Sequence, residues 1–256
     1  MRRTRLGQHF LTDSSVVDKE LAIAQLSAKD IVLEVGPGKG TLTKQLAKNC
    51  QQVIAIEIDN KLVDYLQNIL PKNVTLIHAD IMKSSWDEIP FFTKVVANLP
   101  YQISSPFTFK LFKSSFQKAV LIYQKEFAER MIAHPGSKQY SRLTVGIAYK
   151  AKCCIHQTIP PQSFSPPPEI SSCLVELIPF SQPPFYVKDE SFFFSITKLL
   201  FSHRRKKIRT ILKNAFSTSI PEDIMFGEKR VEMLTPAQIG ALSNDLFELK
   251  LFLKKY

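Results

Sequence analysis

The fold class of this chain is decided by the stretch Ile31-Val32-Leu33-Glu34-Val35-Gly36-Pro37-Gly38-Lys39-Gly40. Its first five residues form an apolar, β-branched run, which is typical of a buried strand, and three glycines follow at once. Residues 41–47 then have a helical pattern. Glycines at such a turn let a ligand lie against bare backbone, facing the amino terminus of the helix. The stretch therefore predicts the strand, loop and helix that open a doubly wound α/β domain with a parallel sheet.

The spacing of the glycines indicates which kind of ligand this loop suits. Dinucleotide-binding loops read G-x-G-x-x-G, whereas this one reads G-x-G-x-G from Gly36, with Glu34 just before it. This version lacks the geometry that cradles a pyrophosphate and suits a nucleoside without phosphates. Glu57 ends the next apolar run, at 53–56, about twenty positions after the first glycine. An acidic residue placed there can accept hydrogen bonds from both ribose hydroxyls.

Two further strand ends carry groups that suit adenine. The run 74–78 leads to Asp80, which can accept from an adenine amine, and to Ile81, which can pack on the ring. The run 94–97 leads to a tetrapeptide composed of Asn98, Leu99, Pro100 and Tyr101. Pro100 stiffens the turn, Tyr101 offers a stacking face, and the Asn98 oxygen and a backbone carbonyl can accept from an NH2 group. Each acid alone can instead be a helix cap or a solvated residue, and the tetrapeptide an ordinary turn.

Composition and charge indicate a globular protein with a polyanionic partner. The 256 residues are 45% hydrophobic, enough for a full core and a second, smaller domain. Lys and Arg number 34 against 23 Asp and Glu, so nucleic acid is favoured over an acidic membrane surface. No apolar run approaches the roughly 18 to 20 residues of a membrane span, and we expect the protein in the cytoplasm. The four cysteines show no C-x-x-C spacing, so we expect reduced thiols and no metal.

Two segments of the chain are basic, one at the amino terminus and one in the carboxyl-terminal third. Residues 1–10 carry three arginines and no acid, and Asp13 or Ser14 is expected to cap a helix behind this arm. After the proline-containing segment 179–184 the pattern becomes helical, so we expect domains at 1–180 and 181–256. Residues 203–213 carry six cations and no acid, with Ile208, Ile211 and Leu212 expected to face inward from a helix. Such a basic face is often merely solvated. With the net charge of +11 we favour RNA phosphate contact by Arg204, Arg205, Lys206, Lys207 and Arg209.

Together these motifs resemble the S-adenosylmethionine-dependent methyltransferases that dimethylate adenosine in small-subunit ribosomal RNA, the KsgA/Dim1 family. The similarity covers nearly the whole chain, in order. It extends over residues 7–11, the glycine loop 34–40, Glu57, Asp80 and Ile81, the tetrapeptide 98–101, the helix 124–130, the proline-rich loop 164–172 and the basic segment 201–207. Residues 102–107 look closer to the archaeal and eukaryotic branch than to the bacterial one.

The resemblance implies a Rossmann-like class I methyltransferase sheet with a smaller helical domain, S-adenosylmethionine as cofactor and a monomeric enzyme without metal. The cofactor contacts that it implies are His9, Leu11, Gly36, Gly38, Glu57, Ile58, Asp80, Ile81 and Asn98. The catalytic residues that it implies are Asn98, Leu99, Pro100, Tyr101 and Phe164. His9 is a departure, because many relatives have asparagine there. Its side chain is expected to contribute less than the neighbouring backbone.

The chemistry needs little more than positioning. The exocyclic nitrogen of adenine shares its lone pair with the ring, so it is a poor nucleophile while it stays planar. Asn98 oxygen and the carbonyl of Leu99 or Pro100 would favour the pyramidal nitrogen, whose positive charge grows as the methyl group transfers. The swung-out base would be held between Tyr101 and Phe164. Phe164 could instead simply fix the proline-rich loop to the core.

The expected substrate is a pair of adjacent adenosines in a hairpin loop near the 3′ end of small-subunit ribosomal RNA, each methylated twice during subunit biogenesis. Antibiotic-resistance methyltransferases, which act on large-subunit RNA, usually carry isoleucine at the position of Leu99. A DNA adenine methyltransferase would be expected to show D-P-P-Y. A non-catalytic ribosome-assembly or RNA-binding factor would show a degraded glycine loop or tetrapeptide, and both are intact here.

Overall fold

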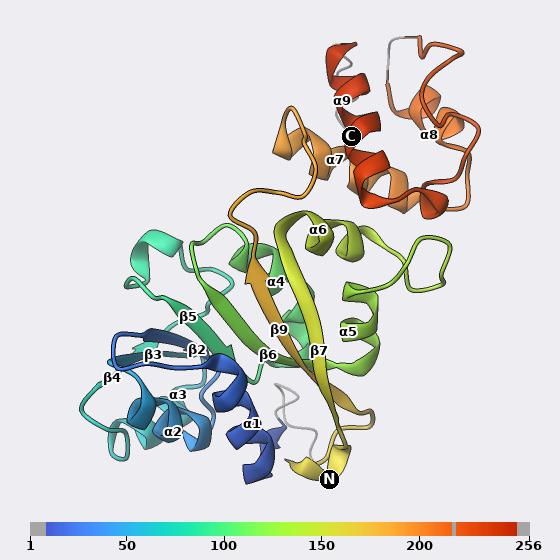
Figure 1. Cartoon of the computed structure of the whole chain (residues 1–256). Coiled ribbons are helices and arrows are strands. Elements are labelled where there is room, and N and C mark those ends of the chain that lie inside the picture. Colours follow the sequence, from blue (N-terminus) through green and yellow to red (C-terminus); the bar gives the residue numbers. More distant parts are fainter. Residues whose placement is uncertain (1–8, 217–218, 250–256) are drawn as a thin grey trace. The chain divides into compact units, whose positions relative to one another are not determined.

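The structure, a computed structural model, describes residues 9–216 and 219–249 (Figure 1). The predicted basic arm therefore lies outside the described residues up to position 8. The chain divides into two compact units, one composed of 1–128 and 153–179 and the other of 129–152 and 180–256. The first unit contains the sheet and the cleft described below, and the second is helical.

The first unit is built on a seven-stranded sheet with the order β4-β3-β2-β5-β6-β9-β7. Its parallel strands are β2 (Ile31–Val35), β3 (Gln52–Glu57), β4 (Val74–His78), β5 (Lys94–Ala97) and β6 (Lys118–Gln124). Next to them β9 (Ser172–Pro179) runs antiparallel to β6, and β7 (Ala151–Ile159) forms the edge. The strands expected from the apolar runs are thus confirmed.

Helices cover both faces of the sheet, which is why its strands are continuous apolar runs. On one face the side chains of α1 (Ser14–Ala24) and α2 (Thr41–Asn49) share a core with Val96 and Ile122. On the other face α4 (Ser104–Leu111) places Thr108 Oγ1 2.7 Å from the hydroxyl of Tyr123, the strand neighbour of Ile122. Helix α3 (Asn60–Gln67) also belongs to the first unit. The predicted doubly wound α/β architecture is confirmed.

The strand order reverses between β2 and β5, because the chain proceeds from β2 outward to β4 and then returns to the other side of β2. In open α/β sheets, ligands bind in the crevice at the carboxyl ends of the strands where this reversal occurs. The glycine loop and the tetrapeptide 98–101 leave β2 and β5 at that point. The topology therefore brings the two motifs together.

A small two-stranded sheet, which the sequence did not predict, connects distant parts of the first unit. In it β1 (Phe10–Leu11) pairs antiparallel with β8 (Phe164–Ser165). Thr12 N also donates to the Ser163 carbonyl at 2.9 Å. Asp13 caps α1 by accepting from the Ser15 backbone, which is one of the two predicted caps. The amino-terminal segment is thereby fixed to the proline-rich loop.

The second unit has its own apolar core, made by α6 (Arg142–Lys150), α7 (Glu190–Ser202), α8 (Ile208–Ala215) and α9 (Pro236–Glu248). The preceding helix, α5 (Lys125–Met131), leads into this unit. The predicted inward positions Ile208, Ile211 and Leu212 are buried, and Thr235 caps α9.

One helix prediction was wrong. Residues 203–213 do not form a single basic helix, because α7 ends at Ser202 and α8 begins at Ile208. Lys207 is extended and forms an isolated bridge with Arg230, and Ile208 N donates to the Lys229 carbonyl. These contacts with the segment before α9 hold the basic residues in a turn.

Two further observations concern the described residues alone. No helix among them is long and apolar enough to cross a membrane. The four cysteines are free thiols, and within 9–216 and 219–249 no group of His, Cys, Asp and Glu side chains could hold a metal ion.

Candidate functional site

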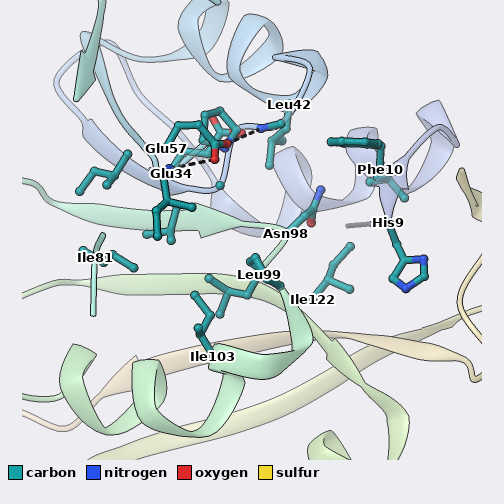
Figure 2. A pocket seen from close by; sticks show the side chains of 18 of the residues that line it. His9, Phe10, Glu34, Leu42, Glu57, Ile81, Asn98, Leu99, Ile103 and Ile122 are labelled. Atoms are coloured by element: carbon teal, nitrogen blue, oxygen red, sulfur yellow. Dashed lines mark hydrogen bonds between the residues drawn. The ribbon is translucent and has the colours of Figure 1, made fainter. Parts of the chain in front are cut away.

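A pocket lies at the carboxyl ends of β2, β3, β4 and β5, and the amino-terminal segment forms part of its wall (Figure 2). It brings together every residue that the sequence indicated for cofactor binding or catalysis. These are His9, Leu11, Gly36, Gly38, Glu57, Ile58, Asp80, Ile81, Asn98, Leu99, Pro100, Tyr101 and Phe164. The individual roles of these residues stay predictions.

The glycine loop forms one wall with its backbone. Gly36 and Gly38 have φ values of 71° and 59°, in the left-handed region that favours glycine. A Cβ atom on Gly38 would lie only 2.8 Å from the ring of Phe10, so any side chain there would displace this ring. The loop thus presents bare peptide groups to the pocket, as expected for close approach of a ligand.

Glu57, at the end of β3, is buried and held by three backbone donors. Its Oε1 accepts from the amides of Ile58 and Asp59, each at 2.9 Å, and its Oε2 from Gly38 N at 3.3 Å. This bonding fixes the carboxylate in one orientation. A carboxylate oxygen can accept more than one hydrogen bond, so Glu57 can still receive ribose hydroxyls.

Beside Glu57 the pocket has an apolar rim. Asp80 Oδ1 accepts from Met82 N at 2.9 Å, and Ile81 behind it is buried. Ile58, next to the buried Glu57, is 51% exposed. A flat heterocycle lying between Ile58 and Ile81 would cover this surface and reach the Asp80 carboxylate.

The tetrapeptide forms the opposite wall. Asn98 Oδ1 is buried and has no hydrogen-bond partner among the described residues, and Figure 2 shows this side chain near the middle of the cleft. Leu99 is buried, and Pro100 has φ −56° and ψ 130°. A buried acceptor without a donor is costly, so this oxygen is suited to a ligand that brings an N–H group.

Tyr101 is held at both its hydroxyl and its ring. The hydroxyl lies 2.6 Å from Ser172 Oγ at the start of β9. His9 is stacked on the ring, and its Nδ1 lies 2.7 Å from the Pro166 carbonyl oxygen, so the imidazole donates there. The His9 side chain is therefore directed toward Tyr101 and the proline-rich loop, in line with the expectation that its own contribution to the cofactor is small.

Phe164 lines the pocket, yet it is only 5% exposed and packs in the core with Leu11, Val17 and Ile122. No ring contact between Phe164 and Tyr101 occurs within the described part of the chain. The structure brings both rings to one cleft without forming a base sandwich. The sandwich stays a prediction.

Sequence reasoning missed several residues of the cleft. Phe10, Val17 and Lys39 line it, and so does Glu34, which is 1% exposed. Burial raises the pKa of Glu34 to about 8, and the nearby charge of Glu57 acts in the same direction. Glu34 therefore carries a proton at neutral pH. A glutamate inside an otherwise apolar strand was the signal that could have identified it.

The residues predicted to contact RNA lie in the second unit, and they differ in whether their side chains are already paired within the protein. Arg204 donates to Glu232 Oε2 at 2.9 Å and to the carbonyls of Lys138 and Ser137. Lys207 and Arg209 are both paired with Glu228, at 2.7 and 3.3 Å. Arg205 and Lys206 are exposed. Their charges face solvent without an ion pair to the described residues.

The donor set of the pocket fits a cationic nucleoside. The acids Glu57 and Asp80 line it together with the protonated Glu34, and the cation Lys39 lines it with its Nζ 5.2 Å from the centroid of the Phe10 ring. Phosphates would meet repulsion here. A ribose, an adenine and a positively charged sulfur would each find a suitable neighbour.

Comparison with known proteins finds similarity to ribosomal RNA methyltransferases over nearly the whole chain. A family model described as ribosomal RNA adenine dimethylase matches residues 1–247. A probable ribosomal RNA small subunit methyltransferase A from Methanosarcina mazei is 43% identical over 95% of this chain and 92% of its own length. The protein of the same description from Methanococcus maripaludis is 42% identical over 97% of this chain and 99% of its own.

Solved structures resemble the chain as well. A dimethyladenosine transferase from Plasmodium falciparum superposes with a TM-score of 0.80 at 29% identity, covering 95% of this chain and 99% of that one. The 23S rRNA methyltransferase ErmE gives a TM-score of 0.68 at 24% identity, covering 92% of this chain and 99% of that one, which shows a shared fold alone.

Proposed function

Because the chain belongs to the family of ribosomal RNA adenine dimethylases, we propose that it methylates N6 of two adjacent adenosines near the 3′ end of small-subunit ribosomal RNA, twice each. It is a ribosomal RNA methyltransferase with the class I methyltransferase fold. Its relatives named above come from archaea, in agreement with the predicted branch. The observation that carries the proposal is that a nucleoside-type cleft and the unpaired oxygen of Asn98 share one pocket.

The cofactor in this proposal is S-adenosylmethionine, whose sulfonium supplies an activated methyl group when it is bound. Glu57 would accept the ribose hydroxyls, because three backbone donors already fix its carboxylate. Asp80, with Ile58 and Ile81, would hold the adenine ring. Leu11, His9 and the glycine loop would close the remaining sides.

The target amine would be received by two acceptors. Asn98 Oδ1 and the carbonyl of Leu99 or Pro100 would accept its two protons and favour the pyramidal nitrogen that attacks the methyl group. Preorganised acceptors of this kind stabilise the charge that develops on nitrogen, so no strong base is needed. Tyr101, fixed by Ser172 and His9, would provide the stacking face for the swung-out base.

The basic surface supports a polyanionic substrate. We propose that Arg205 and Lys206 contact RNA phosphates. Residues 1–180 would form the methyltransferase domain, and residues 181–256, which follow it in the sequence, an RNA-binding domain. We also propose that the protein acts as a monomer. We also place the reaction in the cytoplasm.

Parallel incubations of the protein with labelled cofactor and either small ribosomal subunits that lack this methylation or large subunits, followed by mapping of the modified bases, test the proposal. Two adjacent dimethyladenosines near the 3′ end are expected, with no label in large subunits. Asn98→Ala should abolish transfer while the fold is kept, since it removes an amine acceptor; Asn68→Ala, which removes an exposed carboxamide elsewhere, is the control. Label confined to large-subunit RNA, or full activity of Asn98→Ala, would refute the assignment.

A further inference from the structure

The buried face of helix α1 contains one carboxyl group that its packing does not explain. The other buried residues of the helix, Val16, Val17 and Ala24, are apolar and belong to the core of the first unit. Glu20 occupies the same face, is 0% exposed, and neither of its carboxyl oxygens has a hydrogen-bond partner within residues 9–216 and 219–249. A leucine would fit the same helical period without the cost of burying a carboxyl group. A polar side chain retained at such a position calls for a function.

The neighbour of this carboxyl group is Asn98. Helix α1 packs on β5 and β6, and Asn98 directly follows β5. The Asn98 side chain opposes the rise in the pKa of Glu20 that burial causes, yet neither Glu20 oxygen makes a full hydrogen bond to a described residue. Among the described residues Asn98 Oδ1 has no hydrogen-bond partner either. Glu20 is therefore a neighbour of Asn98, the residue that is proposed to receive the target amine.

The surroundings of Glu20 favour its neutral form. Burial raises its pKa well above the ordinary value, and the nearby carboxyl of Glu34 raises it further. A protonated carboxyl group keeps one carbonyl oxygen that can accept a hydrogen bond. It can therefore hold an amide N–H without placing a negative charge in the core.

A carboxamide needs such a partner because its two ends have nearly the same shape. Packing alone distinguishes the oxygen and the NH2 group of an asparagine poorly, and the hydrogen-bond partner decides which end points where. If the NH2 group of Asn98 faced the cleft, it would meet the amine of the adenine with donor against donor. Catalysis requires the oxygen to face the cleft.

We propose that Glu20 is a positioning residue, which accepts a hydrogen bond from Asn98 Nδ2 and thereby directs Asn98 Oδ1 toward the amine of the target adenine. This inference rests on the proposed function, and it adds to the site a residue that lies outside the wall of the cleft. Glu20 does not touch the reacting atoms. It acts by selecting one of two orientations of the carboxamide.

Three variants test the proposal kinetically. Glu20→Gln keeps a carbonyl oxygen and should retain kcat within about threefold, whereas Glu20→Leu should lower kcat by about 10- to 100-fold, the scale of misplacing a catalytic group. The KM values for cofactor and RNA should change little. Asp18→Leu makes the same kind of change at an exposed position of α1 and should be silent. Wild-type kcat in Glu20→Leu, or an equal loss in Glu20→Gln, would overturn the proposal.

A second measurement separates this inference from the proposed function and does not depend on turnover. In the full chain labelled with 15N-asparagine, the side-chain amide resonances of Asn98 are assigned by their loss in Asn98→Ala. They should be well dispersed and protected from solvent exchange in the wild type and in Glu20→Gln. Unprotected Asn98 amide protons in these two proteins would overturn the inference even if RNA is methylated. Protected protons in a protein that leaves RNA unmodified would contradict only the proposed function.

Discussion

The imidazole of His9 is stacked on the ring of Tyr101, with centroids 5.7 Å apart and planes inclined by 29°. The same imidazole donates from Nδ1 to the Pro166 carbonyl at 2.7 Å. His9 thus connects the amino-terminal segment, the tetrapeptide 98–101 and the proline-rich loop. Under the proposed function, we therefore expect this side chain to serve base binding more than cofactor binding.

Replacing His9 by alanine should separate these two roles. We expect the dissociation constant for the cofactor to stay within about twofold, while kcat/KM for small subunits falls by about 2- to 10-fold, the value of one aromatic pair. Calorimetric titration with cofactor and initial rates at varied RNA give the two quantities. His9→Phe keeps a ring and should recover most of the loss. A large drop in cofactor affinity with unchanged RNA kinetics would contradict this assignment.

Tyr101 offers a ring and a hydroxyl, and their contributions can be measured apart. Tyr101→Phe removes only the bond to Ser172, so we expect a loss of about 2- to 10-fold in kcat/KM, the value of one hydrogen bond. Tyr101→Ala also removes the stacking face, worth roughly 1 to 3 kcal/mol, and should lose considerably more. Ser172→Ala is the matched control for the hydroxyl and should behave like Tyr101→Phe. Equal losses in the phenylalanine and alanine variants would exclude stacking.

The free energy of unfolding should depend on pH through Glu34. Burial raises the pKa of this group from 4.5 to about 8, so between these pH values the folded state holds a proton that the unfolded chain has lost. Stability therefore falls as pH rises through this window, by up to about 1.4 kcal/mol per pH unit for one such group. Glu34→Gln removes the contribution of this group, whereas buried Glu20, whose pKa is also raised, still contributes a dependence of the same sign in both proteins.

Urea denaturation at pH 5, 6.5 and 8 provides the check on this pH dependence. The stability of Glu34→Gln relative to the wild type should increase from pH 5 to 8 and become constant above that. Asp30 and Glu176, whose pKa values are lowered by their hydrogen bonds, lose their stabilising effect only as pH falls below about 4 and do not interfere. A constant difference between the two proteins across the range would show that Glu34 is ionised in the fold.

The basic residues of the turn before α8 should divide into two classes. Arg205→Ala with Lys206→Ala should weaken RNA binding and flatten its salt dependence without affecting unfolding, because both side chains are exposed. Arg204→Ala should instead cost about 1 to 3 kcal/mol of stability, since it removes the hydrogen bonds to Glu232 and to two backbone carbonyls. Filter binding at several salt concentrations and urea denaturation measure the two effects. Unchanged salt dependence in the double variant would remove Arg205 and Lys206 from the RNA surface.

Much of the cleft could be predicted because its groups follow apolar runs in the sequence. Glu57, Asp80 and Asn98 each come directly after such a run, and the carboxyl ends of parallel strands meet at one edge of a sheet. Gly36 and Gly38 could be recognised because only glycine readily adopts the backbone conformation of the loop. These inferences depend on local sequence and on topology alone.

The remaining features depend on contacts between segments that are far apart. The pairing of Phe10 with Ser165 involves two residues on each strand, too few for a periodic signal. The basic turn was expected to be helical because its cations and apolar residues fit a helical period, and the bridge from Lys207 to Arg230 overrides that preference. The burial of Glu20 is not evident from the sequence, because it depends on the sheet beneath the helix.

The pairing of β1 with β8 has a consequence for the order in which the cleft forms during translation. Strand β1 has no partner until Phe164 and Ser165 have been synthesised, long after the glycine loop and the tetrapeptide have left the ribosome. A nascent chain that ends before the proline-rich loop lacks the strand that holds Phe10 and Leu11, and it therefore cannot complete this wall of the pocket. Methylation competence is therefore acquired late, when most of the polypeptide already exists.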